Sequence, residues 1–334
     1  MIEVTILVVI GIALALAFDF GNGRNDAANA VSTVVATRVL SLPAAVFLSA
    51  FFNFVAAFLF STEVAKTVGT GVVDPAAISV YVVLSGLISS IIWIYGLGWL
   101  GIPISSSHSL IGGLMGAAIA AAGWGAIQSE GVVKIVAFIF IAPILSMIFA
   151  FLFSILVFWL ARRTAPGKLQ DLFRKLQLIS VSFYSLGHGT NDAQKTMGVI
   201  SLLLFLGGFS GDSFHIPFWV VLLSHFTIAL GTLAGGQRIV KTMATKITKL
   251  RPIDGFCAET AGAGVIGLCS VFGIPVSTTH VIGGSISGVG VMNRTSAVNW
   301  NVARRIVIAW FLTIPLTAIV AAATYFIMKL ALGL

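Results

Sequence analysis

Long apolar stretches separated by short polar ones dominate this chain. A run of about 20 apolar residues is enough for an α-helix to cross the hydrocarbon core of a bilayer. The stretches lack the strict apolar–polar alternation of transmembrane β-strands. We therefore expect an all-α, polytopic membrane protein, whose first stretch is a membrane segment rather than a cleaved leader. The apolar stretches are 4–20, 42–60, 76–100, 132–160, 195–208, 216–236, 256–272 and 302–332.

Two of the membrane segments are followed by a Gly-Ile-Pro, at 101–103 and 273–275. Each opens a Gly- and Ser-rich stretch, 101–122 and 273–290. Proline and the residue before it interrupt a helix. Non-helical backbone at membrane depth is tolerated only where it is buried in protein or lines a watery cavity. The pattern therefore predicts broken helices and re-entrant helical hairpins at these two places.

Two motifs occur twice, in the same order and at nearly constant spacing. Residues 21–27 (Gly-Asn-Gly-Arg-Asn-Asp-Ala) match residues 187–193 (Gly-His-Gly-Thr-Asn-Asp-Ala). Residues 101–108 (Gly-Ile-Pro-Ile-Ser-Ser-Ser-His) match residues 273–280 (Gly-Ile-Pro-Val-Ser-Thr-Thr-His). Internal repeats build many secondary transporters, often with the halves inserted in opposite orientation. We expect two inverted repeats, 1–160 and 177–334, joined by a basic linker loop, 161–176.

Composition agrees with the membrane assignment, because 58% of the residues are hydrophobic and only 9% are charged. A soluble domain carries about 25% charged residues. The net charge of +8 does not indicate nucleic-acid binding, since Lys and Arg collect in cytoplasmic loops of membrane proteins. We place the basic stretches 161–175 and 238–251 at the cytoplasmic face. The two cysteines, Cys257 and Cys269, have no metal-ligand spacing and are expected to be buried free thiols.

Each repeat carries a carboxylate inside the membrane profile, directly after an asparagine. Ionisable residues at membrane depth mark functional sites by default. Carboxylate and amide oxygens suit a hard cation, as do backbone carbonyls if the flanking glycines let the helix unwind. The alternative is that each pair caps a helix start, although capping requires no second copy. We expect a cation, Na⁺ in preference to H⁺, at Asn25, Asp26, Asn191 and Asp192.

Three hydroxyls in a row follow the proline in each copy of the second motif. Serine and threonine favour helix N-caps, where unpaired N–H groups carry partial positive charge. Hydroxyls and N–H groups of two such helix starts can surround a tetrahedral oxyanion. The alternative is that the hydroxyls only cap or bridge helices. The candidate anion ligands are Ser105, Ser106, Ser107, Ser277, Thr278 and Thr279.

Other residues in these segments permit more than one interpretation. His108 and His280 can bind the ligand, relay protons or pack between helices, and packing is favoured. Glu259, at the start of an apolar segment, is expected to be a cation ligand or proton site. Lys195 lies one turn after Asp192 and would either neutralise it or extend to the interface. Small-xxx-small spacing, which favours close helix packing, occurs in both repeats, at Gly112, Gly116, Gly284 and Gly288.

The two duplicated motifs resemble those of the inorganic phosphate transporter (PiT) family. That family has a Gly-x-Asn-Asp signature near the start of each half, seen here at 23–26 and 189–192, and a repeated Pro-[Ile/Val]-Ser-[Ser/Thr]-[Ser/Thr]-His, seen at 103–108 and 275–280. The resemblance covers nearly the whole chain. It implies cation-coupled symport of inorganic phosphate by alternating access, in a protein that is often a homodimer. Many relatives have a glutamate about where Asn53 stands, which leaves the role of this position open.

The resemblance also implies the ligands and the setting. The chain lacks the long hydrophilic central loop of animal members, which suggests the plasma (cytoplasmic) membrane of a prokaryote. The expected partners are inorganic phosphate, Na⁺ and the lipid bilayer, without nucleic acid, and no cofactor is expected beyond sodium as the coupling ion. The implied phosphate set adds Asp26 and Asp192 to the six hydroxyls. The implied sodium set is Asn22, Asn25, Asp26, Asn191, Asp192 and Glu259.

Alternative functions remain open at this point. Coupling to protons or to a metal cation would use the same carboxylates, and sulfate would fit a similar cradle. Two pseudo-symmetric re-entrant elements would also build a passive anion channel. An intramembrane enzyme with Ser, His and Asp is disfavoured, because every element is duplicated whereas a catalytic triad is single. We therefore do not expect an enzyme.

Overall fold

The computed structural model describes residues 2–59, 62–211, 213–246 and 248–333. Every regular element in these ranges is a helix, apart from one isolated bridge between Val73 and Ile127. The first half contains α1 (Ile2–Ala36), α2 (Leu42–Val55), α3 (Glu63–Thr70), α4 (Val80–Trp99), α5 (Ser106–Ala122) and α6 (Ser129–Ala161). The second contains α7 (Pro166–Leu206), α8 (Phe218–Ala234), α9 (Gln237–Lys246), α10 (Pro252–Val271), α11 (Thr278–Asn293) and α12 (Trp300–Leu332). Short 3₁₀ turns lie between some of them.

The chain is an all-α polytopic membrane protein, as the apolar pattern predicts. Among the described residues, α1, α4, α6 and α12 are long and apolar enough to cross a membrane, and a fifth span follows if the bent pair around α2 and α3 counts as one. Large apolar side chains face outward, such as Leu330 at 88% exposure, while Lys195 and Glu259 are fully buried. This distribution, apolar outside and polar inside, suits a protein surrounded by lipid.

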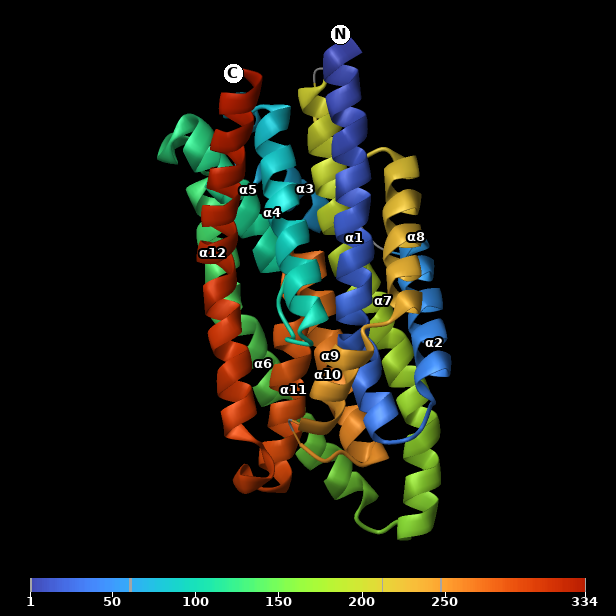
Figure 1. The fold of residues 1–334 in the computed structure, drawn as a ribbon. Helices are drawn as coiled ribbons and strands as arrows, with labels where there is room; N and C mark the ends of the chain where they lie inside the picture. The colour runs from blue at the N-terminus through green and yellow to red at the C-terminus, as the bar shows by residue number, and fades with distance from the viewer. Residues whose placement is uncertain (1, 60–61, 212, 247, 334) are drawn as a thin grey trace.

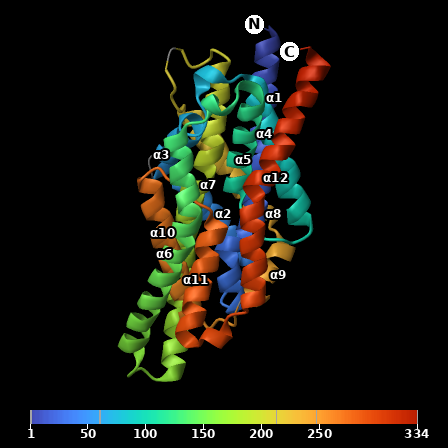
Figure 2. The same ribbon diagram turned by 90° about the vertical axis from the view of Figure 1, so that its left-hand side faces the viewer.

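Two helical hairpins enter the bundle from opposite ends. Figures 1 and 2 show α4 and α5 in the half that carries both termini, and α10 and α11 in the other half. The breaks lie where the sequence predicts them: Gly101 and Gly273 adopt positive φ, of 71° and 64°, which glycine tolerates best. Each hairpin therefore turns inside the molecule.

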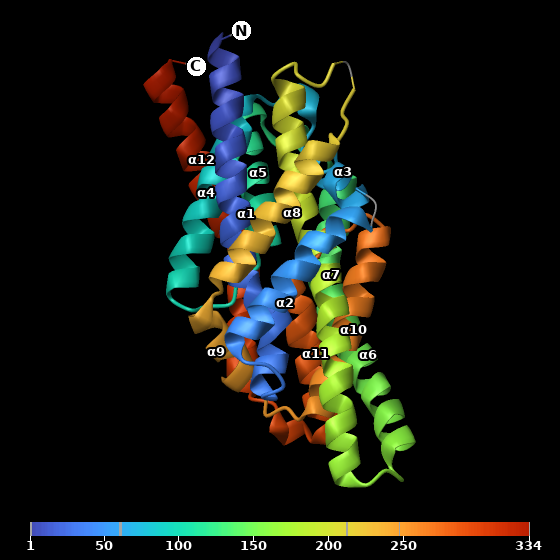
Figure 3. The same cartoon turned by 90° about the vertical axis from the view of Figure 1, so that its right-hand side faces the viewer.

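Helix contacts cross between the two halves. Helix α5 packs on α12, α11 packs on α6, and α1 packs on α8, the last pair lying side by side in Figure 3. A Cβ at Gly116 would lie 2.1 Å from the carbonyl oxygen of Ala318, and one at Gly288 would lie 2.2 Å from that of Met147. The small-xxx-small glycines therefore serve close helix packing, as expected.

Two expectations from the sequence differ from the fold. The basic linker is shorter than residues 161–176, because α7 begins at Pro166 and the following basic residues form its first turns. Proline suits the first helical position, where its missing N–H has no partner to lose. The helix does not unwind at residues 21–27 or 187–193, which lie inside α1 and α7. Gly23 and Gly189 instead let other backbones approach, since a Cβ there would lie 2.3 Å from Ile228 O and 2.7 Å from Asn53 O.

Candidate functional site

The two hairpin tips end in matching helix caps. The Ser105 side chain accepts a hydrogen bond from the backbone N–H of His108 at 3.2 Å, and Ser277 accepts one from His280 at 3.4 Å. The first hydroxyl of each triplet therefore caps its helix, which was the alternative to a ligand role. The next two residues of each triplet begin α5 and α11, where backbone N–H groups lack intrahelical partners.

The middle hydroxyl of each triplet contacts the motif aspartates. The Ser106 hydroxyl lies 2.9 Å from Asp26 Oδ2 and 2.5 Å from Asn22 Oδ1, and it donates its one proton to one of these oxygens at a time. Thr278 donates to Asp192 Oδ2 at 3.1 Å and lies 3.5 Å from Asp26 Oδ2. All five side chains are at least 96% buried. The structure therefore brings carboxylates and hydroxyls from both repeats into one interior site.

The third hydroxyl of each triplet joins one hairpin tip to the other. Ser107, on α5, donates to the carbonyl oxygen of Val276 at 3.0 Å. Thr279, on α11, donates to the carbonyl oxygen of Ile104 at 3.0 Å. The pairs are counterparts under the repeat, so the two tips hold each other symmetrically between the halves.

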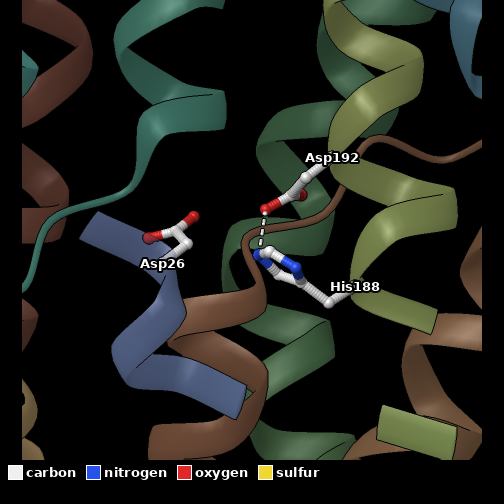
Figure 4. Close-up of side chains that lie close together, drawn as sticks. All are labelled: Asp26, His188 and Asp192. Atoms are coloured by element: carbon white, nitrogen blue, oxygen red, sulfur yellow. Dashed lines mark ion pairs between the residues drawn. The ribbon is translucent and has the colours of Figure 1, made fainter. Parts of the chain in front are cut away.

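The two aspartates lie beside a histidine that was not among the predicted site residues. Asp26, Asp192 and His188 offer ligand atoms within 4.8 Å of one another, and Figure 4 shows the three side chains together. His188 Nε2 lies 3.1 Å from Asp192 Oδ2. Its Nδ1 lies 3.1 Å from Asn53 Oδ1, and Asn53 also donates to Thr232 at 2.9 Å. Asn53 therefore fixes the orientation of the ring.

Lys195 neutralises Asp192 rather than extending to the membrane surface. Its ammonium forms an ion pair with Asp192 Oδ1 and donates to Ser107 Oγ at 2.5 Å and to Val276 O at 3.0 Å. The lysine is fully buried. A buried charge is tolerated only when it is paired and hydrogen-bonded, and all three contacts are oxygens.

The motif asparagines next to the aspartates point toward the hairpin ends. Asn25 donates to Ile94 O at 2.9 Å, and Asn191 donates to Ser270 Oγ at 3.0 Å and Ile274 O at 3.2 Å. Their contacts hold α4 and α10 near the breaks. A sodium-ligand role for these two residues stays a prediction.

Glu259 belongs to a second polar cluster. It accepts hydrogen bonds from Thr33 at 2.6 Å, from Gln177 at 2.9 Å and from Ser180 at 2.5 Å. These side chains come from α1, α7 and α10 and are at least 97% buried. A cation or proton role for this fully buried carboxylate stays a prediction.

The two motif histidines pack rather than face the aspartates. The rings of His108 and His280 meet edge to face at 4.6 Å, and His280 stacks on Trp310 with ring centroids 3.6 Å apart. This geometry favours the packing interpretation.

Sequence reasoning missed Asn29 and His188. Asn29 donates to Thr279 at 2.9 Å and to Thr278 at 3.2 Å, while its Oδ1 has no partner among the described residues. Both residues were detectable by helical spacing, since Asn29 lies one turn after Asp26 and His188 one turn before Asp192. The two copies of the motif carry different residue types at these positions, so the repeat did not single them out.

Comparisons with known proteins identify relatives of this chain. A profile of the Phosphate transporter family matches residues 22–321. A probable low-affinity inorganic phosphate transporter of Rhizobium meliloti is 50% identical over 94% of each chain. A protein of Bacillus subtilis with the same description is 41% identical over 98% of this chain and 97% of its own. A solved structure, described as the sodium-dependent phosphate transporter, superposes with a TM-score of 0.88 at 25% identity, covering 97% of this chain and 99% of the other.

The matches are to transporters, not to enzymes, so they exclude the alternative of an intramembrane enzyme with Ser, His and Asp. They also agree with the many-pass membrane fold and with the phosphate substrate that the family resemblance implied. The profile extends over both repeats and all of the residues at the hairpin tips. This chain belongs to the Phosphate transporter family.

Proposed function

We propose that this protein is a symporter that moves inorganic phosphate together with Na⁺ across the cytoplasmic membrane of a prokaryote. The observation that carries the proposal is the meeting of two hydroxyl-bearing helix starts, one from each repeat, at the buried carboxylates of Asp26 and Asp192. The sodium dependence stated for the solved structural neighbour supports the choice of cation.

Charge balance explains why phosphate would need a cation here. The site holds two carboxylates against one ammonium, that of Lys195. A phosphate anion added beside them would leave unpaired negative charge in a buried place, which costs several kcal/mol per ion. A cation bound at Asp26 relieves that cost, so neither ligand binds well alone. The hydroxyls of Ser106 and Thr278 can rotate to donate to the phosphate.

The arrangement of the hairpins supports alternating access between inverted repeats. The α4–α5 and α10–α11 hairpins enter from opposite ends and touch at their tips (Figure 1). Rocking of one repeat against the other would open the site to one end at a time. The homodimer implied by the family resemblance remains a prediction.

Uptake of radiolabelled phosphate into proteoliposomes tests the proposal. An inward Na⁺ gradient should drive accumulation above equilibrium in the wild type, and the Asp26→Asn variant in matched vesicles should not accumulate phosphate. Accumulation driven only by a proton gradient would show that H⁺, rather than Na⁺, is the coupling ion. Gradient-independent equilibration would indicate a passive channel, and failure of both gradients would contradict symport.

A further inference from the structure

The two repeats differ in charge one helical turn after the motif aspartates. Asn29 follows Asp26 by one helical turn, and Lys195 stands at the equivalent place after Asp192. The hydroxyls and carbonyls at the two hairpin tips are counterparts under the repeat, while His188 beside Asp192 corresponds to Asn22 in the first repeat. The repeat therefore allows one site to be compared with the other inside a single molecule.

The ammonium of Lys195 lies among three oxygens from three different segments. They are a carboxylate oxygen of Asp192, the hydroxyl of Ser107 and the carbonyl oxygen of Val276. Carboxylate, hydroxyl and carbonyl oxygens are also the ligands that hard metal cations prefer. The ammonium of the protein itself therefore occupies the space between these oxygens.

The equivalent oxygens exist in the first repeat, without an ammonium. Thr279 Oγ1 lies 3.0 Å from Ile104 O and 3.4 Å from Asp26 Oδ1. The Nδ2 of Asn29 lies 2.9 Å from Thr279 Oγ1. Its buried Oδ1 has no hydrogen-bond partner among the described residues. An amide that rotates would add a fourth oxygen to the set.

We infer that Lys195 acts as a built-in cation, so that the Asp192 side of the site needs no metal ion and only the Asp26 side takes up Na⁺. This inference rests on the proposed sodium-coupled function and replaces the expectation, drawn from the duplicated motif, that Asp192 also binds sodium. It assigns Lys195 as a residue that sets the number of ions bound with each phosphate. With each phosphate, the chain therefore binds one Na⁺ fewer than a variant with asparagine at position 195 as well as at position 29.

The number of sodium ions bound with phosphate is measurable without transport. Calorimetric titration of the purified full chain with phosphate at several Na⁺ concentrations, with choline holding ionic strength constant, gives that number as the slope of log affinity against log Na⁺ concentration. Lys195→Asn, which copies Asn29 into the second repeat, should raise the slope by one. Its phosphate affinity should then change about tenfold more than that of the wild type for each tenfold change in Na⁺.

A reciprocal variant and a control complete the experiment. Asn29→Lys, which places an ammonium in the first repeat, should lower the slope by one. Lys66→Asn, which removes an exposed lysine paired with Glu63, should keep the wild-type slope. Sodium should also raise the melting temperature of Lys195→Asn more than that of the wild type. The folded variant would bind a Na⁺ at Asp192 that the wild type does not bind, and binding to the folded state stabilises it.

The outcomes separate this inference from the function on which it rests. A sodium-dependent wild type together with an unchanged slope in Lys195→Asn and Asn29→Lys overturns the built-in cation. A wild type whose phosphate affinity ignores Na⁺ contradicts the sodium coupling itself. If Lys195→Asn fails to fold in choline and in Na⁺ alike, the slope of Asn29→Lys decides, and a value equal to the wild type overturns the inference.

Discussion

The two motif aspartates have the same sequence context but different environments. Asp26 accepts hydrogen bonds from hydroxyls, whereas Asp192 is paired with Lys195 and lies 3.1 Å from a nitrogen of His188. Removing one partner of a buried ion pair leaves the other charge uncompensated. The consequences of neutralising the two carboxylates should therefore differ in kind.

We predict that Asp192→Asn destabilises the protein by about 3–5 kcal/mol, because it leaves the Lys195 ammonium buried without its partner. Asp26→Asn should stay folded and lose the sodium dependence of phosphate binding. Thermal unfolding in detergent or nanodiscs compares the two. The double variant Asp192→Asn/Lys195→Met should recover much of the lost stability, and equal stability of both single variants would contradict the assignment.

The hydroxyls of the two triplets should also separate by role. Ser106→Ala and Thr278→Ala should each weaken phosphate binding by about 1–3 kcal/mol, the cost of a lost buried donor. Ser105→Ala removes a helix cap and should instead cost about 1 kcal/mol of stability, with a smaller effect on phosphate affinity. Calorimetric binding and thermal unfolding measured on the same three variants distinguish a cradle residue from a cap.

We predict that a neighbouring carboxylate makes the site selective for phosphate over sulfate. Near neutral pH, phosphate carries an O–H group that can donate a hydrogen bond to the Asp26 carboxylate. Sulfate has no such donor, so the carboxylate would only repel its negative charge. Sites built to pair a specific donor reject analogues that lack it. Excess sulfate should therefore leave phosphate uptake unchanged, and competition comparable to that of unlabelled phosphate would contradict a role for Asp26 as acceptor.

At the scale of helices, the sequence predicted where a helix breaks better than where a helix continues. The Gly-Ile-Pro elements break the chain where expected, because proline and positive-φ glycine act locally. The glycines around Asp26 and Asp192 did not break α1 and α7, since their role is set by a neighbouring backbone that the local sequence does not reveal. The same holds for Asn53 and His188, whose contact joins α2 to α7.

Close packing of the hairpins on α12 and α6 gives a test at this scale. Gly116→Ala would place a Cβ 2.1 Å from Ala318 O, and overpacking of this kind costs about 1–3 kcal/mol. Gly267→Ala, on α10, meets no atom within 4 Å and should be neutral or slightly stabilising, because alanine favours helix more than glycine does. Thermal unfolding of both variants checks the prediction, and equal melting temperatures would contradict close contact between α5 and α12.

At the scale of the whole molecule, the basic residues fix an expected orientation. The α6–α7 connection and α9 lie in the half opposite the two termini (Figures 1 and 3). If both basic stretches face the cytoplasm, Lys168→Cys should react with an impermeant maleimide only from the cytoplasmic side, and Gly125→Cys only from the other. The native cysteines are at least 98% buried and give little background. Labelling of both from one side would contradict the two-ended arrangement.

The position of phosphate decides whether the two hairpin tips form the binding site, and a density map of the protein with phosphate and Na⁺ bound shows that position directly. We expect tetrahedral density within hydrogen-bonding distance of both Ser106 Oγ and Thr278 Oγ1, with a cation against Asp26 and none between Asp192 and Lys195. Phosphate density away from both hairpin tips, with the two aspartates in contact only with protein, would contradict it.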